Sequence, residues 1–509
     1  MTLPALPLLS RRSVLGGVSA LALSALAGPG LAMGGAVPFH PDHVVERARL
    51  LAQMRYRQRP KVPQDWLDLT YEDYQTRWFR SRDALWSTTA RSYNVDFFLP
   101  GLYFPHAVQM HSVAQGLSQP IAFDLSLFDK TDKAPELSTE GALGYSGFRL
   151  RTELSEPGKK NEFCVFQGAS YFRAIGIGQT YGLSARGLAL NTADPEGEEF
   201  PEFTEFWLEA PAPGQREMVV HALMDSPSVT GAYRFTIQPG SPCVMEVEAR
   251  LFARKELSHV GLAPLTSMFL FNRTNRSRFD DFRPAVHDSD GLLIQNGQGE
   301  TLWRPLANPT RLQVSSFVDE NPRGFGLMQR SRDLADFADL EAHYENRPSL
   351  WVEPKGDWGK GAVTLVEIPA DKEIYDNIVA YWRPQTPYPA GSELRLDYRL
   401  TWGTGPDLPL PRVIDSASGA RIFGTPGRIM TVDFEDHPML AGDPDALDVT
   451  LTSAHVELSQ GVLQRNPATG GLRLAFSFDP GSRDHVELRA QLRRDGAPAS
   501  EVWLYRWTA

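Results

Sequence analysis

The sequence predicts an all-β protein, made of a large N-terminal β-sandwich and a smaller C-terminal β-sandwich that is immunoglobulin-like in size. From about residue 90, short apolar or alternating segments are separated by Gly, Pro, Asn and Asp, which is typical of strands joined by turns. Alternation of apolar and polar residues is clearest over 472–478 and 486–492. A Pro- and Gly-rich stretch, 404–411, precedes these last segments and is the best candidate for a linker.

The N-terminus resembles an export signal. Two arginines within residues 10–15 (SRRSVL) precede a weakly hydrophobic run over 16–27, and small residues follow at 30–32. A membrane anchor is the alternative, but the run contains Gly and Ser and is shorter than the roughly 20 apolar residues that span a bilayer. We therefore expect residues 1–32 to be a twin-arginine export signal, the protein to be periplasmic, and the mature chain not to insert stably into the membrane.

Two short helices are expected before the strands begin. Residues 42–58 have apolar side chains at helical spacing, and 71–79 could form a second helix with aromatic anchors. The large sandwich would then occupy 33–403, as one large sandwich or two fused sheets, and the immunoglobulin-like domain 412–509.

Composition and motifs exclude several classes of function. The net charge of −11 disfavours nucleic acid as a partner, because nucleic-acid binders depend on clustered Lys and Arg. Two cysteines, Cys164 and Cys243, are too few for a disulfide framework or a Cys-rich zinc site; we expect free buried thiols, with a single disulfide as the alternative. His40 and His43 have no third metal ligand nearby. We predict no metal and no cofactor, and no serine-hydrolase, zinc-protease or nucleotide-binding motif is present.

Two acidic positions could carry chemistry. Asp288 lies in the segment His287–Gly291, which the pattern Asp-Ser-Asp-Gly predicts to be a tight turn. Asp376 directly precedes the apolar run 378–382, where loss of water would favour a protonated carboxyl group. From the residues alone, a turn residue that opens a strand is the safer interpretation of Asp376.

Aromatic residues stand beside polar ones over 344–361. Sugar rings stack their C–H faces on Trp and Tyr, and their hydroxyls bind fixed Arg, Asn, Asp and Lys side chains. The segment therefore suits a saccharide groove. The alternative is that these aromatics fill the core of a large β-protein.

Five runs of sequence resemble the OpgD/OpgG family of osmoregulated periplasmic glucan biosynthesis proteins. They occur in the family's order and extend over most of the mature chain: 169–174, 225–233, 283–291, 319–326 and 376–382. The twin-arginine signal favours the OpgD-like branch. The resemblance implies a large β-sandwich joined to an immunoglobulin-like domain, a periplasmic location and control of the backbone structure of these glucans.

The resemblance also implies an activity. Members of the family include inverting endo-β-1,2-glucanases and, in one branch, transglycosylases that cyclise the glucan. By position in the matching runs, Asp376 corresponds to the general acid, Asp288 to the general base, and Tyr344 belongs to the chain that relays the proton. We expect Asp376 to be protonated and Asp288 ionised in the complex, because glycosidic cleavage needs one carboxyl group in each state.

The expected partner is a β-1,2-linked glucan, and the glucan-synthesising machinery of the envelope is a possible second partner. The side chains that we expect to bind the substrate are Trp351, Arg347, Tyr171, Arg304 and Trp382. A transglycosylase and a non-catalytic glucan-binding scaffold are the alternatives to a hydrolase. The sequence predicts neither the oligomeric state nor the acceptor of the cleaved chain.

Overall fold

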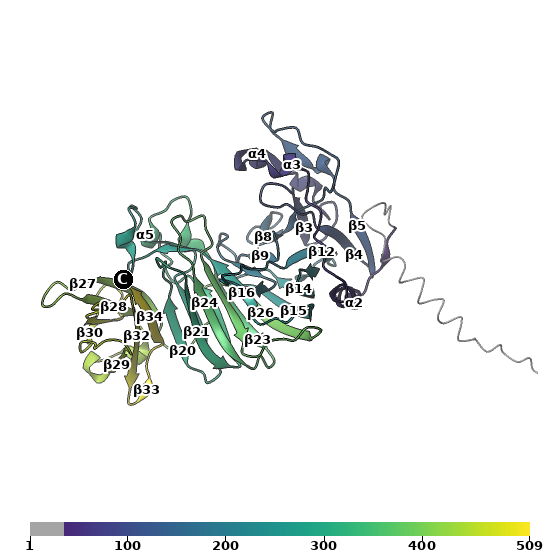
Figure 1. Ribbon diagram of the computed structural model, residues 1–509. Coiled ribbons are helices and arrows are strands. Elements are labelled where there is room, and N and C mark those ends of the chain that lie inside the picture. The colour runs from purple at the N-terminus through teal and green to yellow at the C-terminus, as the bar shows by residue number, and fades with distance from the viewer. Residues whose placement is uncertain (1–34) are drawn as a thin grey trace, which may run out of the picture.

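The computed structural model describes residues 35–509 and is all-β, which confirms the predicted class (Figure 1). The predicted export signal, 1–32, lies outside the described residues. Two large sheets, of 16 and 10 strands, dominate the fold. Within 35–509, no helix has both the length and the apolar character that a membrane crossing requires.

The larger sheet extends from the N-terminal end of the molecule to its C-terminal end. In spatial order its strands are β1 (Val37–Pro38), β5 (Leu117–Ile121), β4 (Gln109–Ala114), β12 (Glu202–Glu209), β13 (Met218–Asp225), β14 (Val229–Gln238), β15 (Cys243–Ala253), β26 (Glu393–Gly403), β23 (Ser349–Lys355), β22 (Gly324–Met328), β19 (Gly291–Gln295), β20 (Thr301–Pro305), β34 (Val502–Thr508), β32 (His485–Arg494) and β29 (Asp448–Thr452), with β33 (Ala497–Pro498) beside β32.

The second sheet packs against the first and completes the large sandwich. Its strands are β21 (Gln313–Glu320), β24 (Lys360–Glu367), β25 (Ile378–Pro384), β16 (Val260–Ser267), β10 (Ser184–Arg186), β9 (Tyr171–Ala174), β8 (Lys160–Gln167), β7 (Gly147–Glu153) and β3 (Tyr93–Phe98), with β11 (Ala189–Leu190) beside β16. Two small ribbons pair β17 (Phe269–Phe271) with β18 (Val286–His287) and β2 (Arg77–Phe79) with β6 (Phe128–Lys130).

The core between the two sheets is rich in aromatic rings. Phe166 of β8 stacks on Phe148 of β7 with ring centroids 5.1 Å apart, and Phe235 of β14 meets the same ring edge-on from the opposite sheet at 5.1 Å. Such pairs add to the stability that burial of the rings provides. Cys164 and Cys243, one from each sheet, are buried in this core and unpaired, as expected.

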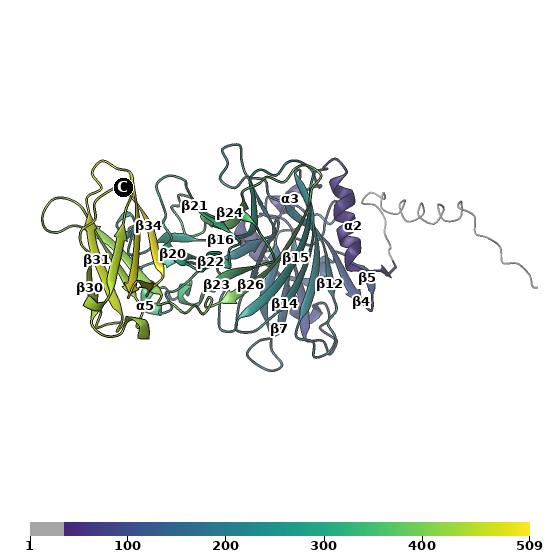
Figure 2. The same cartoon turned by 90° about the horizontal axis from the view of Figure 1, so that it is seen from below.

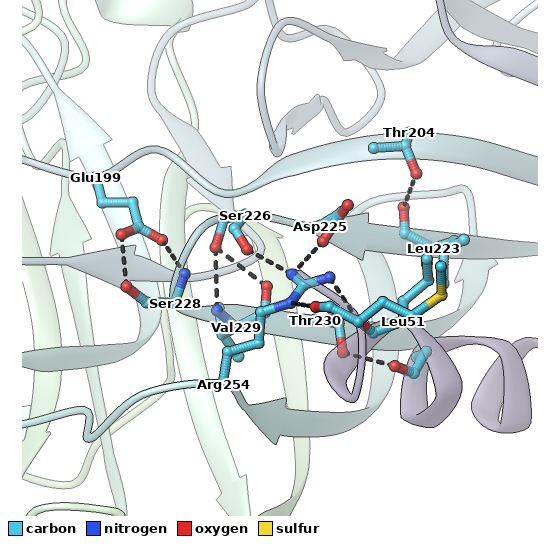
Figure 3. Close-up of polar contacts among 12 residues, drawn as sticks. Leu51, Glu199, Thr204, Leu223, Asp225, Ser226, Ser228, Val229, Thr230 and Arg254 are labelled. Atoms are coloured by element: carbon cyan, nitrogen blue, oxygen red, sulfur yellow. Dashed lines mark hydrogen bonds and ion pairs between the residues drawn. The ribbon is translucent and has the colours of Figure 1, made fainter. Parts of the chain in front are cut away.

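The first predicted helix is present as α2 (Pro41–Ala52), which ends before the predicted residue 58 and packs across β13, β14 and β15 (Figure 2). Arg254 binds the C-terminal end of this helix: its Nη2 donates to the Leu51 carbonyl at 2.7 Å, and Nη1 pairs with Asp225 (Figure 3). A cation at a helix C-terminus satisfies free carbonyl groups and complements the helix dipole. Thr230 Oγ1 donates to the Ala48 carbonyl at 2.7 Å. The run 225–233 therefore anchors α2 to the sheet.

The second predicted helix is correct only in its first half. Helix α4 covers Tyr71–Gln75, and residues 77–79 form strand β2 instead. Pairing with β6 places Phe79 edge-on to Phe128, with ring centroids 5.2 Å apart, so tertiary packing outweighs the helical pattern. Within 35–509 the other α-helices are α3 (Gln64–Leu67) and α5 (Leu334–Phe337), and a 3₁₀ helix, η4, covers Tyr344–Asn346.

The C-terminal strands form a second, smaller pair of layers. Strand β26 ends at Gly403 and the next strand, β27, begins at Val413. A four-stranded sheet, β27 (Val413–Ala420), β28 (Arg428–Phe434), β31 (Leu472–Phe478) and β30 (Val462–Arg465), packs on β29, β32 and β34. Those three strands continue the 16-stranded sheet, because β34 pairs in parallel with β20 through Leu302–Val502 and Trp303–Trp503. The two layers of this end are thus joined to the large sandwich by a shared sheet.

Candidate functional site

Asp288 lies between β18 and β19, on short segments fixed by the surrounding strands. Its backbone N–H donates to the Met268 carbonyl at 2.9 Å, and its side chain is only 10% exposed. Among the described residues, no group donates a hydrogen bond to Asp288 Oδ1. Burial raises the pKa of Asp288 to about 6, and Arg347, whose Nη1 is 3.5 Å from Oδ1, opposes this effect.

The segment His287–Gly291 is not the tight turn that its composition predicts. Asp290 Oδ2 accepts hydrogen bonds from the backbone of distant residues, Arg330 N–H at 2.9 Å and Ser331 N–H at 3.2 Å. Gly291 begins β19, where a Cβ atom would lie 2.1 Å from the Trp303 ring. The glycine is needed for this close approach, and long-range contacts rather than a local turn position Asp288.

Asp376 occupies the loop between β24 and β25. The next residue, Asn377, is buried and fixes the end of the loop: its Nδ2 donates to the Phe269 and Ile368 carbonyls at 2.9 and 3.0 Å. The Asp376 side chain itself is 35% exposed, and its Oδ2 lies 3.6 Å from Arg173 Nη2 of β9. Because Asn377 binds Phe269 and Asp288 binds the adjacent Met268, the two aspartates lie on neighbouring segments, and we refer to Asp288, Asp376 and Arg173 as one cluster.

Tyr344, in η4, joins this cluster through Arg347, which contacts both Tyr344 and Asp288. Its side chain is buried, with its ring 5.7 Å from that of Phe337 and 5.2 Å below the Arg347 guanidinium. Burial raises the pKa of Tyr344, and the negative charges of Glu373 and Asp288 add to the rise. The phenol therefore stays neutral at physiological pH and can both donate and accept a proton beside Asp288.

Arg283 connects the three loops around these residues. Its guanidinium donates to Asp281 Oδ1 at 3.0 Å, to Asp339 Oδ2 at 2.7 Å and to Glu373 Oε2 at 2.5 Å, and its side chain is only 12% exposed. Charge-assisted hydrogen bonds of this kind are the stronger ones in proteins. Arg283 thus ties the loop that carries Asp376 to the segment that leads to Tyr344.

Arg173 and Arg283 are the site residues that sequence reasoning missed. Both lie in runs that carry the family resemblance, which was the available signal. Their importance follows from partners that are far away in the chain, such as Glu373, 90 residues beyond Arg283.

The residues predicted to bind substrate divide into two groups. Arg347 and Tyr171 border the cluster: Arg347 contacts Asp288, and the Asp376 charge contributes to the raised pKa of Tyr171, for which burial is the main cause. Trp351, Trp382 and Arg304 are at most 5% exposed and present no surface to a sugar. The two tryptophans fill the core, and Arg304 forms a buried ion pair with Glu367 at 3.1 Å.

Comparison with known proteins identifies the family. Residues 39–507 match the family described as "Periplasmic glucan biosynthesis protein, MdoG". This chain belongs to the MdoG family. Proteins named glucans biosynthesis protein G from Vibrio cholerae O395 and Shewanella sp. ANA-3 are each 48% identical over 477 and 476 residues, which is 92% of this chain and 87% of theirs.

Family membership confirms the resemblance to the OpgD/OpgG proteins and a role in periplasmic glucan biosynthesis. The relatives named above carry the name of the G protein, so they do not support the predicted OpgD-like branch. A solved polysaccharide lyase aligns with a TM-score of 0.22 and 11% identity, over 72% of this chain and 44% of the lyase, which is too distant to carry an argument.

Proposed function

We propose that this protein cleaves β-1,2-linked glucan by inversion and so sets the backbone structure of periplasmic glucans, with Asp288 as general base and Asp376 as general acid. The observation that carries the proposal is the contrast between two neighbouring carboxyl groups, one buried with a pKa of about 6 and one exposed on a loop beside Arg173. Two carboxyl groups in different surroundings are the usual basis of acid–base glycoside cleavage.

Asp288 suits the role of base. A carboxylate with a pKa of about 6 accepts a proton more readily than an ordinary aspartate and is still ionised at neutral pH. Its Oδ1 is buried and has no hydrogen-bond donor among residues 35–509, so a proton would have to reach it through a neighbouring group such as the Tyr344 hydroxyl. Arg347 stabilises the negative charge. In the reaction, water would add to the anomeric carbon and its proton would pass to Asp288 through Tyr344.

Asp376 would supply the proton to the leaving oxygen as the glycosidic C–O bond breaks. In the free protein its Oδ2 lies 3.6 Å from Arg173 Nη2. A glucan that lies over Asp376 would exclude water and separate this pair, and loss of water favours the protonated acid. The expected protonation of the two aspartates thus applies to the complex, since in the free protein it is Asp288 whose pKa is raised.

Three finer assignments accompany this proposal. The Ser-Arg-Arg sequence within 10–15 supports export by the twin-arginine route and an OpgD-like role. The layers formed by residues 412–509 would be the immunoglobulin-like domain. Transfer to a sugar hydroxyl is the second candidate reaction, because the exposed Ile374 and Tyr375, beside Asp376, could hold a sugar acceptor in place of water.

The test is incubation of the mature protein with linear β-1,2-glucan, followed by measurement of product size and anomeric form. We expect shorter chains with inverted anomers, and loss of these products in Asp376→Asn. Asp371→Asn, an exposed aspartate of the same loop, is the matched control and should remain active. Cyclic products would establish transfer instead of hydrolysis. Glucan that binds but stays intact would refute the enzyme and favour the scaffold.

A further inference from the structure

A cavity lies beside Tyr171, and neither Asp288 nor Asp376 is among the residues that line it. Its volume is about 160 Å³, and it has an apolar floor that includes Phe166 and Phe203. Its polar wall is formed by Arg59, His106 and Glu202. A concave site with an apolar floor and a few convergent polar groups is the usual form of a small-molecule site.

The charged groups in this wall neutralise one another. Arg59 Nε donates to Glu202 Oε2 at 3.1 Å, and His106 Nδ1 lies 3.1 Å from Glu202 Oε1. Burial would raise the pKa of Glu202, but Arg59 and His106 outweigh that effect and lower it. The carboxylate is therefore ionised and paired, so the cavity suits a neutral ligand with hydroxyl groups better than an anion.

His106 has one ring nitrogen to offer a ligand. Its Nδ1 interacts with Glu202, and among the described residues its Nε2 is buried and has no hydrogen-bond partner. When Nδ1–H donates to the carboxylate, Nε2 is an acceptor. A buried acceptor without a partner is costly, and a ligand hydroxyl would satisfy it once the His106 ring turns Nε2 toward the cavity.

The cavity has aromatic residues at its rim, and a nearby turn has an uncommon backbone conformation. Tyr103 is 74% exposed at the mouth, and Phe104 and Tyr171 form the sides. The turn between β8 and β9 has Ala169 at φ 40°, a positive value that is uncommon for a non-glycine residue and that often marks binding sites. A Cβ atom at the preceding Gly168 would lie 3.1 Å from the Phe104 ring.

We propose that this cavity is a distal subsite that holds one sugar ring of the glucan whose other residues lie over Asp376. Tyr171 links the two places, because it lines the cavity and lies on the same face of β9 as Arg173, whose Nη2 is 3.6 Å from Asp376 Oδ2. The volume would hold about five water molecules of ~30 Å³ each, which suits a single ring. The inference rests on the proposed function and adds to it a preference for long chains.

The subsite can be tested by binding alone, in an Asp376→Asn background that keeps the glucan intact. Calorimetry would compare a β-1,2-linked trisaccharide with long linear β-1,2-glucan. Tyr103→Ala removes the exposed rim ring. His106→Asn keeps a donor for Glu202 and removes Nε2. We expect each variant to bind long glucan about tenfold more weakly, because one stacking or hydrogen-bonding contact is lost. Binding of the trisaccharide should be unchanged.

The control is Trp78→Ala, an exposed aromatic residue outside the cavity lining, which should bind both ligands as the parent does. Unchanged binding of long glucan by both cavity variants, or an equal loss for both ligands, would overturn the subsite. The proposed cleavage is judged separately with the wild type: intact long glucan there would refute the hydrolase, while a length-dependent loss of binding would still support the subsite.

Discussion

The two aspartates of the candidate site are held in opposite ways. Asp288 is 10% exposed and lies between two strands whose partners fix it, whereas Asp376 is 35% exposed and lies on a loop that Arg283 and Asn377 secure. The fold itself therefore sets the position and the pKa of one carboxyl group. The position of the other depends on loop contacts, and under the proposed function a bound glucan would complete the site.

The largest expected effect comes from removing either carboxyl group. Asp288→Ala and Asp376→Asn should each lower the rate of glucan cleavage by about 10² to 10⁴, the usual contribution of a general acid or base. The two losses should respond differently to chemical rescue. Azide should restore activity to Asp288→Ala only, and a glucoside with a good leaving group should be cleaved by Asp376→Asn only. The reverse pattern would exchange the assigned roles.

The next largest effect on the rate of cleavage should come from loosening the loop that carries Asp376. Arg283→Gln removes the ion pairs to Asp339 and Glu373, so kcat should fall by up to about 10²-fold through misplacement of Asp376. Amide exchange over 369–377 should accelerate at the same time. Arg395→Gln breaks an exposed ion pair with Asp397 and serves as the control. An unchanged kcat with faster exchange would show that the loop position does not limit catalysis.

The pH dependence tests the buried aspartate. Because Asp288 must be ionised to act as base, kcat/KM should rise tenfold per pH unit below pH 6 and level off above it. Arg347→Gln removes the cation that lowers this pKa, so the acidic limb should move to higher pH. A limb that stays in place in this variant would mean that another group titrates.

The smallest expected effect is on the free energy of unfolding, which should depend on pH differently in variants of Asp288 and of Asp376. The folded-state pKa of Asp288 is raised, so its ionised form destabilises the fold increasingly as pH rises from about 4 to about 6. Asp288→Asn should therefore stabilise the protein at pH 7.5 by up to about 3 kcal/mol and have no such effect below about pH 4. Asp376→Asn should leave the melting temperature nearly unchanged at both pH values. Equal shifts in the two variants would contradict the comparison.

The sequence predicted the parts of this structure that depend on local pattern. Strand alternation over 472–478 and 486–492 appears in the structure as β31 and β32, where buried and partly buried side chains alternate except at Gln491, which is buried. The first helix followed from apolar spacing, and Pro41 with the His40 cap fixes its start. These features rely on periodicity, which a single sequence contains in full.

The parts that could not be predicted depend on contacts between distant segments. Trp351 and Trp382 stand near polar residues in the chain, but which face of a strand meets the core is decided by the opposite sheet. Strand β2 exists because Phe79 meets Phe128, 49 residues later by the printed sequence. Arg283 has partners 56 and 90 residues away. Neither propensity nor spacing contains this information.

The position of β34 has a consequence for how the chain folds. This last strand lies between β20 and β32, so the shared sheet cannot close until the C-terminus has been synthesised. Until then, Trp303 of β20 lacks its partner Trp503 and remains exposed. Long-range pairing of this kind slows folding and leaves apolar surface open to aggregation. Insertion of β34 between β20 and β32, rather than formation of the first strands, would therefore complete the shared sheet.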